Sequence, residues 1–144
     1  MRHTLRASST IVIVPVRVLI VDDEPAIVDS LTLILQRHGY EVTGVTTFDE
    51  ARRLLRATPP PDLLLTDVRL GSYNGLQLVV LRNAMTAAII MSGYWDTTIA
   101  DEGRQHGAIY LLKPVPHAQL LDTIERALAA RPSPGEPTPG TAPV

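Results

Sequence analysis

The sequence predicts an α/β fold in which a parallel sheet of five strands carries helices on both faces. Short apolar runs alternate with segments of helical period along residues 16–131, so each predicted strand is followed by a predicted helix. The run at residues 63–65 is apolar at every position, which is typical of a strand buried on both faces. Helical connections of this kind join parallel strands and cover the sheet.

The strands are predicted from runs rich in branched apolar residues. The first run stops at Asp22 and the third at Asp67, so both end next to acidic residues. The second run is the weakest pattern of the five. The predicted strands cover residues 16–21, 41–45, 63–66, 87–91 and 109–112.

Helices are predicted in the intervening segments from apolar positions at helical spacing. The first closes at Gly39, and Gly107 stops the fourth. Thr47 and Glu50 have capping-box spacing, so Thr47 should be the N-cap of the second helix. The first helix carries Ile27, Leu31, Ile34 and Leu35, and the others are expected at 47–57, 76–82, 97–105 and 117–130.

Both ends of the chain lie outside this pattern. Residues 1–15 are expected to be an N-terminal extension ahead of the domain at 16–131. A secretion signal is disfavoured there, because the apolar run before Pro15 has only four residues. Residues 132–144 are rich in proline and glycine, which favours a solvated, disordered tail.

Composition restricts the function further. The chain has 144 residues, 45% of them hydrophobic, which suffices for one core. The formal charge is −2, without the basic excess expected of a direct nucleic-acid partner. There is no cysteine, so thiolate chemistry is excluded. Arg17 and Asp22 interrupt the most apolar segment, so no membrane span is expected and the protein should be soluble and cytoplasmic.

Polar residues follow the predicted strands at the point where each strand ends. In an open parallel sheet, the carboxyl ends of the strands border the functional crevice. Carboxylates that converge there repel one another unless they are protonated or meet a cation. Mg²⁺ suits such an all-oxygen set, and an ammonium and a hydroxyl suit phosphoryl oxygens. The residues concerned are Asp22, Asp23, Glu24, Asp67, Ser92, Gly93, Lys113 and Pro114.

Each of these residues also has a structural interpretation when it is taken singly. Asp23 could cap the following helix, because Pro25 suits its first turn. Asp67 and Ser92 could be turn residues, and Lys113 could be an exposed lysine before a helix. Their joint placement favours a phosphoryl site.

The chain resembles the receiver domain of two-component response regulators over residues 16–131. The resemblance implies the flavodoxin-like receiver fold, a sheet with strand order 2-1-3-4-5. The motifs that carry it are VLIVDDEP at 18–25, LLLTDVRL at 63–70, NGL at 74–76, IIMSG at 89–93 and YLLKP at 110–114.

The resemblance implies a role for each residue of the crevice. Asp67 would be the phosphoacceptor, and Lys113 would pair with the phosphoryl group. A cis Lys113–Pro114 peptide bond would hold the Lys113 ammonium toward Asp67. Mg²⁺ would be held by Asp22, Asp23, Asp67 and the backbone carbonyl of Arg69. An ionised Asp67 needs no general base to act as a nucleophile.

The resemblance also implies a switch and its partners. Ser92 would bind a phosphoryl oxygen once Asp67 is modified, and Tyr110 would move in response. The phosphoryl group would come from a histidine kinase or a phosphotransfer protein, and a downstream protein effector would bind the changed surface. Arg69 and Tyr94 should flank the path of the water that hydrolyses the acyl phosphate.

The chain departs from the family pattern in places. Gly71 stands where proline is frequent, and Val115 stands where phenylalanine is frequent. The segment between Asp67 and Ser92 is short, which predicts a third helix about one turn shorter than usual.

Three function classes remain open at this stage. The leading one is a stand-alone receiver that accepts and loses phosphate without being a turnover enzyme, since only the tail follows residue 131. A metal-dependent phosphatase would need an Asp-x-Asp pair after the first strand, which Asp22-Asp23-Glu24 does not supply. The third class is an interaction domain that has lost the chemistry, against which the retention of Asp67, Ser92 and Lys113 argues.

Overall fold

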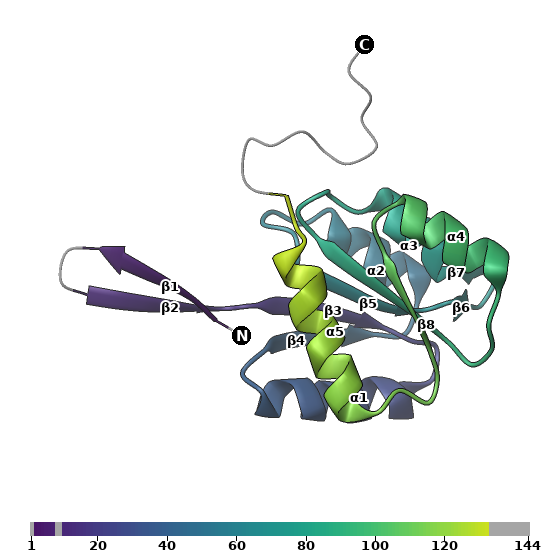
Figure 1. Ribbon diagram of the computed structural model, residues 1–144, viewed down its shortest axis with the longest axis horizontal. Coiled ribbons are helices and arrows are strands. Elements are labelled where there is room, and N and C mark those ends of the chain that lie inside the picture. Colours follow the sequence, from purple (N-terminus) through teal and green to yellow (C-terminus); the bar gives the residue numbers. More distant parts are fainter. Residues whose placement is uncertain (1, 8–9, 133–144) are drawn as a thin grey trace, which may run out of the picture.

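The computed structural model describes residues 2–7 and 10–132, and it shows a parallel sheet between two layers of helices (Figure 1). The sheet order is β4-β3-β5-β8-β9, which in chain order is 2-1-3-4-5. The predicted fold class and strand order are therefore confirmed. The five strands are β3 (Arg17–Val21), β4 (Glu41–Val45), β5 (Leu63–Asp67), β8 (Ala87–Ser92) and β9 (Ile109–Leu112).

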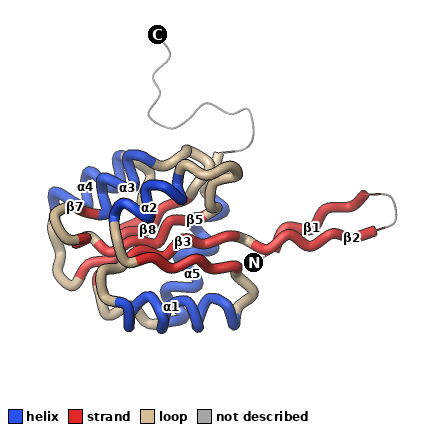
Figure 2. Tube along the Cα trace, turned by 180° about the vertical axis from the view of Figure 1, so that it is seen from behind, coloured by secondary structure: helices blue, strands red, loops and turns tan. Residues whose placement is uncertain are grey.

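Five helices cover the two faces of this sheet (Figures 1 and 2). On one face, α1 and α5 pack against Val18 and Ile20 of β3, while α2, α3 and α4 lie on the other face with Leu19 and Val21. Alternate residues of one strand thus enter different cores, which explains the continuous apolar runs. The helices are α1 (Pro25–Arg37), α2 (Phe48–Leu55), α3 (Gly75–Leu81), α4 (Thr97–Gln105) and α5 (His117–Ala129).

The predicted element boundaries agree with the structure to within two residues. The Thr47 hydroxyl accepts a hydrogen bond from the Glu50 backbone N–H at 3.3 Å, so the predicted N-cap of α2 is confirmed. The predicted end of this helix at Ala57 is wrong by two residues, since α2 ends at Leu55. The third helix, α3, is short, with seven residues.

Two antiparallel hairpins were not predicted. Within the N-terminal extension, β1 (Arg2–Ala7) pairs with β2 (Thr10–Pro15), and both strands project away from the sheet and its helices (Figures 1 and 2). In the expected loop after Asp67, β6 (Arg69–Leu70) pairs with β7 (Tyr73–Asn74). Gly71 lies between these strands with a φ of 62°, a conformation that favours glycine.

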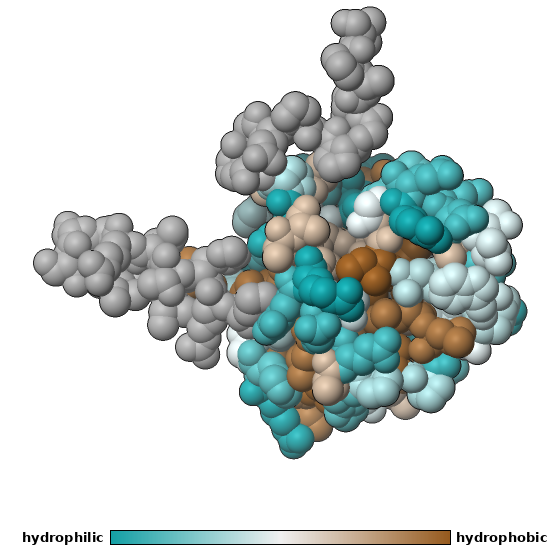
Figure 3. Space-filling model, in the orientation of Figure 1, coloured by the Kyte–Doolittle hydropathy of each residue, from teal (hydrophilic) through white to brown (hydrophobic). Residues whose placement is uncertain are grey.

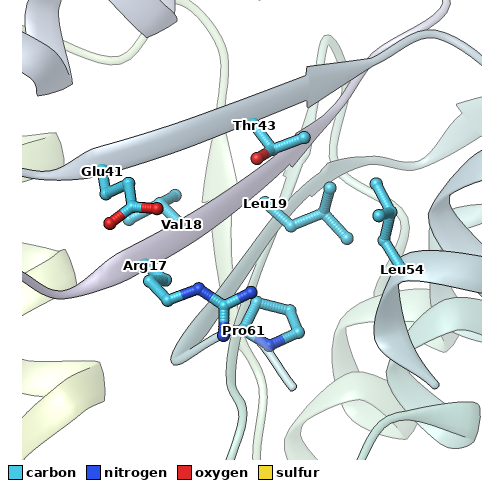
Figure 4. Close-up of a pocket in the computed structure, with 7 residues that line it drawn as sticks. All are labelled: Arg17, Val18, Leu19, Glu41, Thr43, Leu54 and Pro61. Carbon is cyan, nitrogen blue, oxygen red and sulfur yellow. The ribbon is translucent and has the colours of Figure 1, made fainter. Parts of the chain in front are cut away.

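The amino ends of the strands are closed by packing and hydrogen bonds. A small pocket of about 60 Å³ lies there between β3, β4 and α2, with Arg17, Glu41 and Leu54 in its lining (Figure 4). The Arg17 guanidinium donates to the carbonyl oxygens of Pro59 and Pro60 beside this pocket. This end of the sheet lies opposite the predicted site.

Two expectations concern the chain ends and the membrane. The predicted disordered tail, apart from Pro132, lies outside the described residues. Across residues 2–7 and 10–132, no helix has the length and apolar character that crossing a membrane requires.

Candidate functional site

The fold brings the predicted site residues to one edge of the sheet. Asp22 directly follows β3, and Asp67 is the last residue of β5. Ser92 is the last residue of β8, and Lys113 directly follows β9. Since all four strands are parallel and neighbours in the sheet, their carboxyl ends lie side by side.

Three carboxylates form a cluster at this edge. Asp22, Asp23 and Asp67 each offer an oxygen, and these oxygens lie within 4.8 Å of one another. Asp22 is buried, Asp67 is partly exposed and Asp23 is exposed, so the cluster opens to solvent on one side. Three oxygen ligands with an open side fit Mg²⁺, which binds a few carboxylates and keeps several waters.

Lys113 places a positive charge between two of these carboxylates. Its Nζ lies 3.0 Å from Oδ2 of Asp22 and 3.4 Å from Oδ1 of Asp67. Burial alone lowers the pKa of Lys113, but the hydrogen bonds and charges of Asp22 and Asp67 outweigh it and raise this pKa. The Lys113–Pro114 bond is cis, as the resemblance implied. The ammonium is therefore charged and held beside Asp67.

The polar contacts of the Asp67 carboxylate involve one of its two oxygens. Its Oδ1 accepts a hydrogen bond from the Val68 N–H at 2.9 Å and also faces Lys113. Among the described residues, its hydrogen-bond and ion-pair contacts all fall on Oδ1. Burial raises the pKa of Asp67, Lys113 lowers it in part, and the charge of Asp22 raises it further. Folding thus disfavours the charge on this group when no metal is bound.

Ser92 and Tyr110 share one hydrogen-bond acceptor. The Ser92 hydroxyl donates to the Tyr94 carbonyl oxygen at 2.8 Å, and the Tyr110 hydroxyl donates to the same oxygen at 3.0 Å. Trp95 packs edge-on against Tyr110, with ring centroids 4.9 Å apart. Ser92 is therefore close in the fold to Asp67, while its hydroxyl is turned to the next loop.

Arg69, after β5, and Tyr94, after β8, contact each other. The Arg69 guanidinium lies 4.8 Å from the centroid of the Tyr94 ring and donates to its hydroxyl. Arg69 is two residues after Asp67 and Tyr94 two after Ser92, and their role beside the path of the attacking water stays a prediction. The metal role of the Arg69 carbonyl stays a prediction.

Gly75 is a site residue whose role the sequence reasoning did not identify. A Cβ at this position would lie 2.2 Å from the Asp67 carbonyl oxygen and 2.9 Å from the Thr66 side chain. The Gly75 N–H donates to the Val68 carbonyl at 2.8 Å. Only glycine allows α3 to begin this close to the end of β5. The NGL motif at 74–76 was the available signal.

Comparisons with known proteins decide the family. The family model of the response regulator receiver domain matches residues 18–125. The chain belongs to this family. Protein PilH of Pseudomonas aeruginosa is 35% identical over 119 residues, which cover 78% of this chain and 98% of PilH. Transcriptional regulatory protein FixJ of Bradyrhizobium diazoefficiens is 32% identical over 117 residues, with 77% of this chain and 56% of FixJ covered.

A solved receiver domain supports the same assignment. The CheY-like receiver domain protein of Methanospirillum hungatei aligns with a TM-score of 0.74 and 32% identity, over 81% of this chain and 96% of that one. The receiver domain spans about half of FixJ and 28% of PilR of Pseudomonas aeruginosa, so the activities of those whole proteins do not transfer. The comparisons support membership in the receiver-domain family of two-component signalling, whose domains are phosphoacceptor switches.

Proposed function

We propose that this receiver domain accepts a phosphoryl group on Asp67 in a Mg²⁺-dependent reaction and then presents a changed surface to a protein effector. The donor would be a histidine kinase or a phosphotransfer protein. One observation carries the proposal: the Asp22, Asp23 and Asp67 oxygens cluster within 4.8 Å, with the Lys113 ammonium 3.4 Å from Asp67. Direct nucleic-acid binding and a membrane role are not expected, and a cytoplasmic location stays a prediction from the sequence.

The transfer step uses the free oxygen of Asp67. Oδ2 attacks the phosphorus of a phosphohistidine, a P–O bond forms, and the P–N bond breaks with its electron pair going to the imidazole nitrogen. Asp22, Asp23, Asp67 and the Arg69 carbonyl would hold Mg²⁺, which neutralises phosphoryl charge when bound. Lys113 supplies the second positive charge, and its position beside Oδ1 suits a phosphoryl oxygen on Asp67.

The reaction ends when water hydrolyses the acyl phosphate. The carboxylate of Asp67 is then regenerated and inorganic phosphate is released, so the domain returns to its first state without turning over a separate substrate. Arg69 and Tyr94 contact each other, and together they would cover the approach of this water. We therefore propose autodephosphorylation whose rate these two side chains limit.

Ser92 and Tyr110 link the modified carboxylate to the surface. If the Ser92 hydroxyl turns to a phosphoryl oxygen, it leaves the Tyr94 carbonyl, which Tyr110 also binds. The loop between β8 and α4 then has a second arrangement available, and the phosphoryl group biases the choice between them.

The affected surface is apolar enough to bind a protein. Trp95 is 56% exposed and Leu112 is 48% exposed, and both lie next to the switch residues in sequence or in space. Figure 3 shows apolar side chains gathered beside α5, over the β9 edge of the sheet. We propose this surface, formed by α4, β9 and α5, as the effector site.

Intact-mass spectrometry tests the proposal. With acetyl phosphate and Mg²⁺, the wild type should gain one phosphate, and the gain should disappear in EDTA. Asp67→Asn should gain none, whereas Asp62→Asn, at the opposite end of the same strand, should gain one. A metal-independent gain, or a gain in Asp67→Asn, would show that the assigned chemistry is wrong.

A further inference from the structure

The N-terminal hairpin extends beyond the receiver fold as an isolated two-stranded unit. Its register runs from Arg2↔Pro15 to Ala7↔Thr10, and both strands project from the domain (Figures 1 and 2). The only sheet that contains β1 or β2 in the described chain is this pair. A two-stranded hairpin is marginally stable at best in water, so this segment needs a further strand.

The two free edges of the hairpin differ in charge. The β1 sequence, RHTLRA, contains Arg2, His3 and Arg6. The β2 sequence, TIVIVP, contains no ionisable residue and four consecutive branched apolar residues. Charged residues protect an edge strand against pairing, and an uncharged apolar edge invites it. The edge of β2 is therefore the one open to strand addition.

The register identifies which backbone groups of β2 face that edge. Pro15 has no N–H, so its pairing with Arg2 is of the kind that exchanges no hydrogen bonds. Pairs with and without hydrogen bonds alternate along an antiparallel ladder, so Ile13 and Ile11 are of the same kind as Pro15. The N–H and C=O groups of Ile11 and Ile13 consequently point to the free edge of β2.

We propose that the free edge of β2 pairs with β2 of a second copy of this chain, antiparallel about a twofold axis at Val12. Ile11 of one copy then faces Ile13 of the other, and each such pair exchanges both backbone hydrogen bonds. The two copies of β1 lie on the outer edges of a four-stranded sheet. Their basic residues are then separated by about three strand spacings, or roughly 14 Å.

This arrangement fits a second copy better than an unrelated strand. The β2 edge offers no charge for a partner to recognise, whereas antiparallel self-pairing matches its length and keeps the like charges of β1 apart. Through Val16, β2 leads into β3, and the carboxylate cluster lies at the opposite end of β3. The dimer therefore leaves the phosphorylation site accessible and does not depend on the proposed function.

Cysteine cross-linking tests the register directly. The chain has no cysteine, so Val12→Cys introduces a single thiol. At the twofold axis its Cα would lie about 4.5 Å from that of its mate, a distance a disulfide can span. Mild oxidation of the full chain should give a covalent dimer. Leu5→Cys, at the position of β1 that pairs with Val12, should give no covalent dimer.

Sedimentation equilibrium supplies a test without cross-linking. The wild type should be a dimer, with or without phosphorylation. Ile13→Lys should be a monomer, because it places charge on the paired edge, whereas Thr4→Lys, at the cross-strand partner of Ile13, should remain a dimer. A monomeric wild type, loss of the dimer in both variants, or equal cross-linking of Leu5→Cys and Val12→Cys would overturn the proposal.

Discussion

Strand β5 has a carboxylate at each end, and the two have opposite surroundings. Both carboxylate oxygens of Asp62, just before the strand, accept hydrogen bonds. Oδ1 accepts from the Arg131 guanidinium at 3.0 Å and Oδ2 from the Arg17 backbone N–H at 2.8 Å. At the other end, the polar contacts that the structure gives Asp67 all fall on Oδ1, beside the charge of Asp22. We therefore propose a structural role for Asp62 and a reactive role for Asp67.

Other contacts at the amino and carboxyl ends of the sheet show the same contrast. At the amino end, Arg82 donates to the carbonyl oxygens of Val79, Thr86 and His106, and so binds the ends of α3 and α4. Burial lowers the pKa of this arginine. At the carboxyl end, like charges converge on one lysine. We propose that the amino end of the sheet mainly stabilises the fold and that the carboxyl end carries the chemistry, which the following variants can test.

The largest effect is expected at Gly75, because a side chain there should disturb both the packing of the fold and the position of Asp67. Gly75→Ala forces a methyl group against the Asp67 carbonyl, only 2.2 Å away, and should lower the free energy of unfolding by about 3 kcal/mol. It should also slow phosphorylation, because the end of β5 must shift. Gly93→Ala, with no heavy atom within 4 Å of its Cβ, should change stability by less than about 0.5 kcal/mol. Urea unfolding of both variants measures the difference, and equal stabilities would contradict the packing argument.

The two carboxylates of β5 should respond oppositely to neutralisation. Asp62→Asn should lower the free energy of unfolding by about 2 kcal/mol, because it removes the ion pair between the partly buried side chains of Asp62 and Arg131. Asp67→Asn in EDTA should raise it, since burial and Asp22 raise the pKa of Asp67 and disfavour its charge in the folded state.

The pH dependence gives the sign of this second effect. A raised pKa in the folded state means that ionisation destabilises the fold. The advantage of Asp67→Asn should therefore be present at neutral pH and vanish below the ordinary pKa of aspartate, where both states are protonated. A loss of stability in Asp67→Asn at neutral pH without metal would contradict the description of the reactive end.

A variant of Ser92 tests whether modification of Asp67 changes the conformation of the α4 and β9 surface. Beryllofluoride, an acyl-phosphate mimic, should shift the amide resonances of α4 and β9 in the wild type. Ser92→Ala should reduce these shifts, since the hydroxyl that leaves the Tyr94 carbonyl is gone. A bias of about 1–2 kcal/mol between the two arrangements is expected. Identical shifts in both proteins would mean that Tyr110 packs without switching.

The smallest effect concerns the lifetime of the phosphorylated state. Replacing Arg69 and Tyr94 together by alanine opens the approach of water, and hydrolysis should accelerate about five-fold, or roughly 1 kcal/mol. Arg104→Ala, which removes an exposed arginine paired with Asp101 elsewhere, should leave the lifetime unchanged. Phosphate release after rapid donor removal measures both rates, and an unchanged or longer lifetime in the double variant would refute the shielding role.

Much of the fold and the positions of the site residues could be predicted from the sequence. The apolar runs gave the five strands because strands buried on both faces need apolar residues at successive positions. Thr47 gave the start of α2 because capping is a local interaction. Asp22, Asp67, Ser92 and Lys113 could be placed together because each lies at the carboxyl end of a strand of one parallel sheet.

What could not be predicted depends on contacts between distant residues. The strands β6 and β7 have two residues each, too few for any periodicity. Glycine is needed at position 75 because it lies close to Asp67, eight positions earlier. The hydrogen bond to Oδ1 of Asp62 comes from Arg131, 69 positions later in the chain. The direction of the Ser92 hydroxyl likewise depends on the fold of the Tyr94 loop.

The measurement that tests the contrast most directly locates the phosphate on the unaltered chain. Trypsin should release residues 57–69 as one peptide, which contains both Asp62 and Asp67. After phosphorylation, borohydride reduces an acyl phosphate of aspartate to homoserine, and fragment ions locate the changed residue. The account predicts homoserine at position 67 and intact aspartate at position 62. Homoserine at position 62, or at neither position in a chain that has gained phosphate, would contradict it.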